Sequence, residues 1–364
     1  MNHPENDAAY KGLKVNRGAS APDTNPYLKR IPERKIFSVG EYVSGILEGN
    51  VALLSQAVTL IESAKPEHQF LAQQIIERCL PHTGKSVRIG ITGVPGSGKS
   101  TVIDTFGMYL IREGHKIAVL AIDPSSERSK GSILGDKTRM ESLSREKNAF
   151  IRPSPAAGSL GGVARKTRET VILCEAAGYD TVIVETVGVG QSETAVHSMV
   201  DFFLLIQIAG AGDELQGIKR GVMEMADGII INKADGDNME KAELAAASYR
   251  NALQLFPPAD SGWKPKVLTC SGYYALGIRE VWNMIRDYIA FTKGNGYFDR
   301  KRIEQAKYRM YESMNCQLHD IFYHHPNIAS QLPRMEQKVL NSEISSFMAA
   351  KQLIDLFYIY GDKK

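Results

Sequence analysis

Eight consecutive residues, from Gly93 to Ser100, carry the clearest chemistry in the chain. They read Gly-Val-Pro-Gly-Ser-Gly-Lys-Ser and fit the phosphate-binding pattern G-x-x-x-x-G-K-[ST]. The glycines let the backbone wrap closely, so that successive N–H groups point at phosphate oxygens. Lys99 supplies positive charge to the outer phosphates, and the Ser100 hydroxyl is a ligand for Mg²⁺. The predicted nucleotide-binding residues are Gly93, Val94, Pro95, Gly96, Ser97, Gly98, Lys99, Ser100 and Thr101.

A second motif indicates which base the nucleotide carries. The apolar run at 228–231 ends in Asn232-Lys233-Ala234-Asp235. A carboxylate at Asp235 can accept two hydrogen bonds from guanine N1–H and the 2-amino group, whereas adenine would leave it unpaired at a high cost. The stem of Lys233 can cover a base face, while Asn232 ties the loop to its neighbours. Downstream of a phosphate loop, this motif predicts binding of GTP and GDP rather than ATP.

The segment between these motifs predicts a switch. The strand-like run at 180–184 ends in Glu185-Thr-Val-Gly188, where most GTPases have D-x-x-G. The longer carboxylate of Glu185 can still reach Mg²⁺, directly or through water, and the N–H of Gly188 would meet the γ-phosphate. Val189 stands where Ras-like enzymes carry the glutamine that orients water, so slow intrinsic hydrolysis is expected. Gln191, two residues late, is either a substitute for that glutamine or a helix-start residue.

Two more carboxylates are candidates for the metal shell. Asp123 follows an apolar run at 116–122, and Asp136 lies in Gly-Asp-Lys-Thr-Arg. Both could face the metal and the γ-phosphate. Asp123 could equally be a turn residue before Pro124, and Asp136 a helix N-cap.

Taken together, these residues resemble a known family. The strings are Gly-x-Pro-Gly-x-Gly-Lys-Ser-Thr, Asp-Pro-Ser-Ser, Gly-Asp-Lys-Thr-Arg-Met, Glu-Thr-Val-Gly-Val-Gly-Gln-Ser-Glu and Asn-Lys-Ala-Asp. They are similar to those of the methylmalonyl-CoA mutase-associated GTPases, called MeaB or ArgK in bacteria, whose human counterpart belongs to cobalamin metabolism. The likeness runs from about Phe37 to Gly296.

The resemblance implies roles for particular residues. It implies that Ser100, Asp123, Asp136 and Glu185 surround Mg²⁺ and the γ-phosphate. It implies an extra switch at 207–219 that communicates with the mutase, with Asp213 and Lys219 as its polar candidates; read alone, that stretch could be only a connection. The catalytic candidates are Lys99, Asp136, Glu185 and Lys219.

The base loop departs from the resemblance. The family usually has Cys-Ser-Ala, whereas this chain has Cys270-Ser271-Gly272-Tyr273. Because the contact to guanine O6 comes from backbone N–H groups, glycine at 272 is expected to be tolerated. Ser271, Gly272 and Tyr273 therefore join Asn232, Lys233, Asp235 and Gly188 among the predicted nucleotide contacts.

The elements that must position these residues alternate between strand and helix. Apolar strands are expected at 87–92, 116–122, 180–184, 202–208, 228–231 and 266–269, which predicts an α/β P-loop NTPase with a parallel sheet flanked by helices. The expected organisation is a mobile arm at 1–36, a helical segment at 37–84, a GTPase domain at 85–295 and a helical segment at 296–364. Helices are expected at 297–323 and 345–358, and the resemblance implies that this last segment forms a homodimer; alternatively it is a lid on its own domain.

The composition limits which partners and which cellular compartment are expected. The chain has 364 residues, 43% hydrophobic and 23% charged, with a net charge of +3, and shows no electrostatic footprint for nucleic acid. No apolar run reaches the roughly 20 residues that a membrane helix needs. The four cysteines form no C-x-x-C, and residues 1–5 lack the features of a secretory leader, so a cytoplasmic protein with free thiols is expected.

The predicted function is that of a Mg²⁺-dependent GTPase that acts as chaperone or gatekeeper for an adenosylcobalamin-dependent mutase, by resemblance methylmalonyl-CoA mutase. Two alternatives stay open. A nickel-insertion GTPase would need a Cys/His metal site, and Cys79 and His82 are the one closely spaced pair. A kinase linked to transport of basic amino acids is the other, although Asn232–Asp235 predicts guanine rather than adenine.

Overall fold

A seven-stranded parallel sheet forms the centre of the computed structural model, which describes residues 36–123, 140–155, 160–186, 192–210 and 220–361. The chain divides into two units after Ser38, and the elements below belong to the second, Val39–Lys364. The strand order is β3-β2-β4-β1-β5-β6-β7, and the neighbours pair in parallel. The strands are β1 (Val87–Gly93), β2 (Ile117–Asp123), β3 (Ala149–Pro155), β4 (Thr181–Thr186), β5 (Phe202–Ile208), β6 (Gly228–Asn232) and β7 (Lys266–Thr269).

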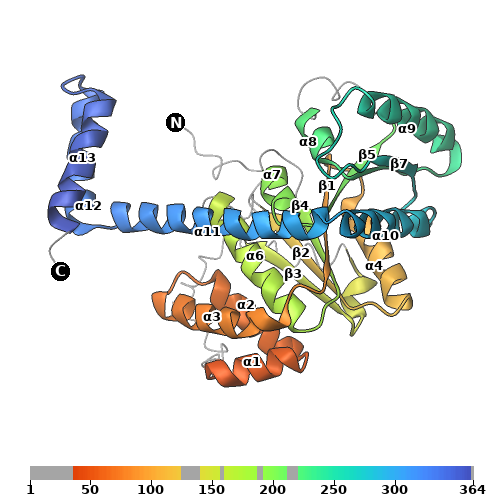
Figure 1. The fold of residues 1–364 in the computed structure, drawn as a ribbon, viewed down its shortest axis with the longest axis horizontal. Coiled ribbons are helices and arrows are strands. Elements are labelled where there is room, and N and C mark those ends of the chain that lie inside the picture. The colour runs from red at the N-terminus through yellow and green to blue at the C-terminus, as the bar shows by residue number, and fades with distance from the viewer. Residues whose placement is uncertain (1–35, 124–139, 156–159, 187–191, 211–219, 362–364) are drawn as a thin grey trace, which may run out of the picture. The chain divides into compact units, whose positions relative to one another are not determined.

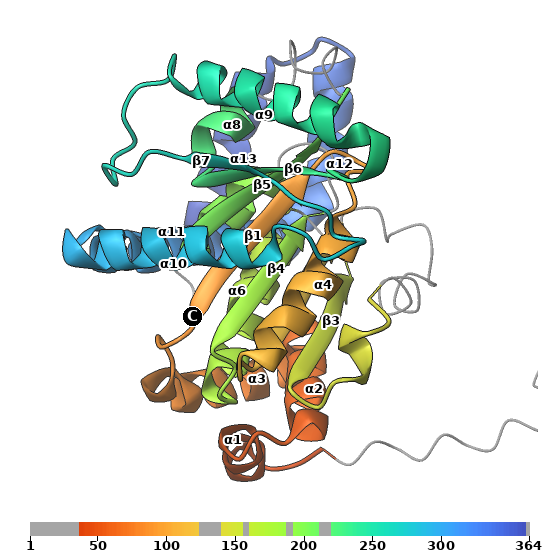
Figure 2. The ribbon, with the colours of Figure 1, turned by 90° about the vertical axis from the view of Figure 1, so that its right-hand side faces the viewer.

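Helices cover both faces of this sheet (Figures 1 and 2). Their apolar sides pack on strands that are buried on both faces and therefore read as continuous apolar runs. One face carries α4 (Lys99–Arg112) and α10 (Ile278–Gly294). The other face carries α6 (Leu160–Ala176), α7 (Ser192–His197), α8 (Arg220–Met225) and α9 (Met239–Leu253). Short 3₁₀ turns lie at η3 (Leu80–His82), η4 (Leu143–Arg145) and η6 (Gly236–Asn238).

Three N-terminal helices pack on the outer side of α6. They are α1 (Val39–Leu47), α2 (Val51–Glu62) and α3 (Pro66–Cys79). Asn50 caps α2, because its side chain accepts hydrogen bonds from the N–H groups of Ala52 and Leu53. Pro66 occupies the first turn of α3, where a missing N–H costs nothing.

Three further helices follow the sheet domain. They are α11 (Tyr297–Tyr323), α12 (Pro326–Leu340) and α13 (Ser346–Gly361). The first part of α11 lies against α10 and α6, and α12 and α13 pack on each other at its far end (Figure 1). In the part of the chain described, none of the helices combines the length and the apolar character needed to cross a membrane.

The predicted fold class is confirmed, with one strand added. β3 was not expected, because Arg152, Pro153 and Pro155 interrupt its apolar pattern. It is an edge strand that pairs only with β2, and proline is tolerated at sheet edges. The long helix at 297–323 is confirmed, and α12 is an additional helix in the C-terminal segment.

Candidate nucleotide site

The phosphate loop joins β1 to α4 at the carboxyl edge of the sheet. Gly96 and Gly98 adopt positive φ angles of 77° and 83°, which glycine takes without strain. A Cβ at Gly93 would lie 2.2 Å from the carbonyl oxygen of Ile206 on β5. The glycines therefore permit both the turn and the close approach of the next strand.

The side chain of Lys99, the first residue of α4, folds back over the phosphate loop. Its Nζ donates hydrogen bonds to the carbonyl oxygens of Gly93 (3.0 Å) and Val94 (3.2 Å), and the residue is 9% exposed. A buried ammonium beside the N-terminus of α4 makes the loop strongly electropositive. This arrangement suits the binding of an anionic phosphate chain.

Ser100 and Glu185 come from different elements and meet at the carboxyl edge of the sheet. The Ser100 hydroxyl, in the first turn of α4, donates to Oε1 of Glu185 at 3.2 Å. Glu185 lies near the end of β4 and is 7% exposed. A hydroxyl and a carboxylate side by side are oxygen ligands of the kind that Mg²⁺ prefers, so the residues present fit this metal.

Asn232 connects the phosphate loop to the base loop. Its Nδ2 donates to the carbonyl of Ser97 at 2.7 Å, and its Oδ1 accepts from the N–H of Gly272 at 3.0 Å. The thiol of Cys270 is 3.6 Å from the same oxygen. Asn232 is 3% exposed, and it fixes two loops that are 135 and 40 residues away from it in sequence.

Asp235 is held by the base loop as well. Its Oδ2 accepts a hydrogen bond from the Ser271 hydroxyl at 2.5 Å, and the Ser271 hydroxyl in turn accepts from the N–H of Tyr274 at 3.2 Å. Lys233, between the two fixed residues, has a positive φ of 60°. The motif is thus rigidly presented at the carboxyl end of β6, with the rings of Tyr273 and Tyr274 edge to face at 4.9 Å.

Gly272 packs directly against α4. A Cβ there would lie 2.9 Å from Cγ2 and 3.1 Å from the backbone N of Val102, so alanine would require α4 or the loop to shift by a few tenths of an ångström. The Thr105 hydroxyl donates to the Gly272 carbonyl at 2.6 Å. The departure from Cys-Ser-Ala therefore coincides with a tight contact between loop and helix.

Several predicted residues lie outside the described part of the chain: Asp136, Gly188, Gln191, Asp213 and Lys219. Asp123 ends β2 at the same sheet edge, one position beyond the pairing of Ile122 with Thr186, but its side chain is not described. The structure thus brings together the phosphate loop, Ser100, Glu185 and the base-reading residues, while the roles of Asp123 and Asp136 as metal ligands stay predictions.

Two polar residues near the site were not predicted to matter. Thr105 looks like an ordinary helix residue, and only the fold brings it to Gly272. Gln207 was noted only as the first residue of the 207–219 segment, yet it is 1% exposed on β5. A glutamine inside the apolar run Phe-Phe-Leu-Leu-Ile-Gln-Ile was the signal that could have singled it out.

The spaced Cys/His pair does not form a metal centre. Cys79 is fully buried at the end of α3, whereas His82 is exposed. Burial raises the pKa of the Cys79 thiol to about 11, so the thiolate that a metal needs is disfavoured at neutral pH. Among the described residues, no group of three His, Cys, Asp or Glu side chains is placed to hold a metal.

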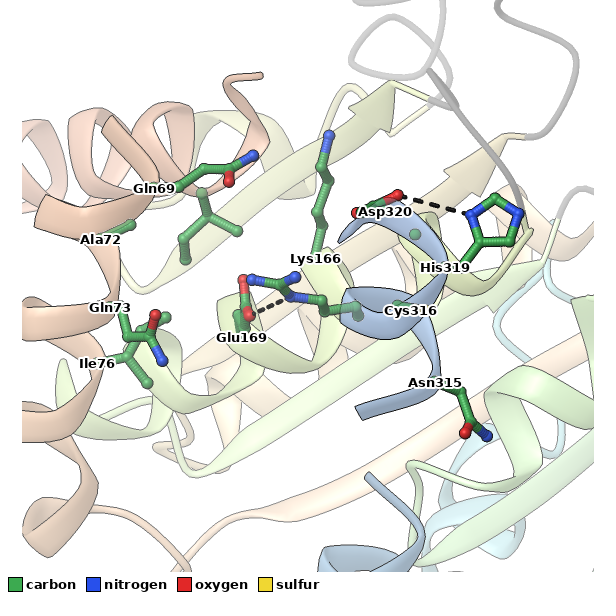
Figure 3. A pocket seen from close by; sticks show the side chains of 13 residues that line it. Gln69, Ala72, Gln73, Ile76, Lys166, Glu169, Asn315, Cys316, His319 and Asp320 are labelled. Carbon is green, nitrogen blue, oxygen red and sulfur yellow. Dashed lines mark hydrogen bonds and ion pairs between the residues drawn. The ribbon is translucent and has the colours of Figure 1, made fainter. Parts of the chain in front are cut away.

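A cavity of about 460 Å³ lies away from this edge, between α3, α6 and α11. Figure 3 shows Gln69 and Gln73 of α3 on the left, Lys166 and Glu169 of α6 in the middle, and Cys316 of α11 on the right. Its wall contains no residue of the phosphate loop or the base loop. The cavity is therefore separate from the nucleotide site.

A parallel sheet with a phosphate loop after its first strand and a guanine-reading motif after a later one defines a P-loop GTPase. Within that class, the chain belongs to the family described as methylmalonyl Co-A mutase-associated GTPase MeaB, whose model matches residues 54–327. It binds guanine nucleotides and hydrolyses GTP.

Its relatives carry several names. GTPase ArgK of Escherichia coli (strain K12) is 51% identical over 269 residues, covering 74% of this chain and 81% of the relative. The Mus musculus protein named methylmalonic aciduria type A homolog, mitochondrial, is 44% identical, with 88% and 79% covered. The crystal structure of a protein named LAO/AO transport system kinase superposes with a TM-score of 0.70 at 38% identity, covering 89% of this chain and all of that one.

Proposed function

We propose that this GTPase acts as a chaperone or gatekeeper for an adenosylcobalamin-dependent mutase, with methylmalonyl-CoA mutase as the client. The observation that carries the proposal is membership of a family described as mutase-associated, together with the 44% identity to the mouse methylmalonic aciduria type A homolog. GTP hydrolysis would shift the protein from one conformational state to another. This change would load, protect or restore the cofactor of the mutase.

The phosphate end of the site would perform the hydrolysis. Lys99 and the N–H groups of residues 94–99 would hold the phosphates, and charge that develops on them would be stabilised electrostatically. Ser100 and Glu185, with Asp123 and Asp136, would hold Mg²⁺, which supplies Lewis-acid polarisation of the phosphate oxygens when bound. Lys219, in the proposed switch at 207–219, would also take part in catalysis.

The base end would select guanine through Asp235 and one backbone donor. In the loop after β7, the N–H groups of Ser271, Gly272 and Tyr274 are each occupied within the protein. Tyr273 is the residue of the 271–274 turn for which no backbone N–H partner occurs among the described residues. We assign its N–H, rather than that of Gly272, to guanine O6.

The C-terminal helices would join two copies. Residues on α11–α13 expose large apolar side chains, including Leu318 (61%), Phe347 (86%) and Tyr358 (71%). Many exposed large apolar side chains on one segment suit an interaction site, and closed two-fold dimers are the commonest oligomers. We propose a homodimer through this segment, working in the cytoplasm, where the free cysteines of the chain stay reduced.

The test is GTP turnover with and without methylmalonyl-CoA mutase from the same organism. We expect at least about a tenfold rise in kcat, which corresponds to roughly 1.4 kcal/mol of barrier. The mutase should also bind more tightly in the presence of a GTP analogue than of GDP, because coupling between sites is reciprocal. Absence of both effects would refute the client.

The same assay distinguishes the kinase alternative, which the name of the solved relative raises. With GTP labelled at the γ-phosphate, a GTPase releases labelled inorganic phosphate, whereas a kinase transfers the label to a protein. Labelled protein that accumulates in proportion to the GTP consumed would favour the kinase.

A further inference from the structure

Gln207 is a buried amide without a hydrogen-bond partner among the described residues. It is 1% exposed, and both Oε1 and Nε2 are left unpaired by the part of the chain that the structure describes. Leaving both ends of a buried amide unpaired is unfavourable, whereas an apolar side chain of similar size at such a position is tolerated or stabilising. A glutamine here therefore needs an explanation other than the stability of the nucleotide-free fold.

Its position in the sheet places it level with the phosphate loop. Ile206 pairs with Gly93, the last residue of β1, and Gln207 follows it on β5, paired with Ile231 of β6. The carbonyl of Ile206 also closely approaches Gly93. The backbone of the phosphate loop is therefore in direct contact with the end of β5 that carries Gln207.

The side chain lies on the sheet face opposite to α4. Leu204 and Ile206 belong to the core under α4, while Leu205 belongs to the core under α9, and side chains alternate along a strand. By the same alternation, Thr92 of β1 and Thr186 of β4 share the face of Gln207. These two buried threonines are hydrogen-bonded at 2.8 Å, so the carboxyl ends of β4, β1 and β5 carry a row of buried polar groups there.

We propose that Gln207 is a positioning residue for GTP hydrolysis. Its amide gains hydrogen bonds when the triphosphate occupies the loop, and it then holds the carboxyl ends of β1 and β5 in the geometry that hydrolysis requires. The bonds formed with GTP compensate for the burial of this amide.

The test replaces the amide with an apolar side chain of the same length. For Gln207→Met we expect a melting temperature equal to or above that of the wild type without nucleotide, and normal stabilisation by GDP. The additional stabilisation by the non-hydrolysable analogue guanosine 5′-(β,γ-imido)triphosphate should shrink, because the bonds that the amide makes in the triphosphate-bound state are lost. The kcat should fall about tenfold or more, because the strand ends are no longer held in the geometry that hydrolysis requires. Gln207→Asn, a shorter amide, should recover part of kcat.

A matched control is Gln305→Met on α11. Gln305 is also buried, and its Oε1 is unpaired among the described residues, but its Nε2 donates to the carbonyl of Val200 at 2.8 Å, at the opposite end of β5. We expect this variant to lose stability and keep kcat. The proposal is overturned if Gln207→Met keeps kcat within about twofold, or if its kcat and its nucleotide-free melting temperature fall together, as in a purely structural role.

Discussion

At the scale of single residues, Asn232 is the centre of the site. Its sequence position predicted that it ties the base-reading loop to its neighbours, and the hydrogen bonds to Ser97 and Gly272 confirm that connection. A Cβ at Gly98 would lie 2.6 Å from its amide nitrogen. Motif residues could be predicted because their types and spacing are typical of one chemistry. Thr105 could not, because its partner Gly272 is distant in sequence, and Gln207 was marked only by its polar type inside an apolar run.

The first residue-scale prediction concerns the base. Asp235→Asn should weaken GTP and GDP binding by about 2–3 kcal/mol, because an ionic acceptor of two hydrogen bonds is lost. Xanthine nucleotides, which carry an oxygen in place of the amino group, should bind the variant better than the wild type. Calorimetry with GTP, GDP, a xanthine nucleotide and ATP measures these affinities. Equal binding of ATP and GTP by the wild type would contradict the guanine assignment.

The second residue-scale prediction concerns the metal. Glu185→Gln should keep GDP binding and lose at least about a hundredfold in turnover, because an anionic ligand becomes a neutral amide. Ser100→Ala should abolish the Mg²⁺ dependence of GTP affinity. Phosphate release and binding titrations at several Mg²⁺ concentrations give both readouts. Normal turnover of Glu185→Gln would show that the metal shell lies elsewhere.

At the scale of helices and strands, the elements that could be predicted are those with a clear hydrophobic pattern in the sequence. Strands β1, β2, β4, β5, β6 and β7 lie at the apolar runs that the sequence showed, and α11 matches the expected bounds. β3 escaped prediction because an edge strand with two prolines is stabilised by pairing with β2, a contact that no local pattern encodes. Helix α6 is likewise joined to the sheet by a buried ion pair, Glu175 with Arg88 of β1.

That ion pair gives a pH prediction. Burial alone would raise the pKa of Glu175, but the hydrogen bond and charge of Arg88, with Ser86 and the N–H of Gly84, lower it below its ordinary value of 4.5. The unfolded chain therefore binds the proton more readily. This carboxylate's contribution is present above about pH 4.5 and is lost as the pH falls through the lower folded pKa.

Glu175→Gln should accordingly lose about 3 kcal/mol of unfolding free energy at pH 7, because Arg88 stays buried without its partner. Its unfolding free energy should also fall less steeply than that of the wild type below pH 4.5. Urea titrations across this range measure both quantities. Parallel pH profiles for the two proteins would refute the assignment to Glu175.

At the scale of the whole molecule, the C-terminal helices set the assembly. The double variant Phe347→Asp, Tyr358→Asp should convert the proposed dimer to a monomer, because two carboxylates would have to be buried unpaired. Sedimentation equilibrium measures the mass, and basal GTP turnover should be unchanged, since neither residue lies at the nucleotide site. Lys351→Asp, at an exposed position of the same helix, is the control. A double variant that still sediments with the mass of the wild type would place the contact elsewhere.

Helix α11 is attached near its N-terminus to the sheet, so a rotation there would displace the far end of the helix. Arg302, in its second turn, binds Asp201 and the carbonyls of Gly84 and Ser86, all at the ends of β1 and β5 away from the nucleotide. At 1.5 Å per residue, the 27 residues of α11 span about 40 Å. A rotation of roughly 5° about this attachment point would move α12 and α13 by about 3.5 Å at that length. The ends of β1 and β5 opposite to the phosphate loop are thus bonded to α11, so a small tilt of these strands would become a larger displacement at α12 and α13.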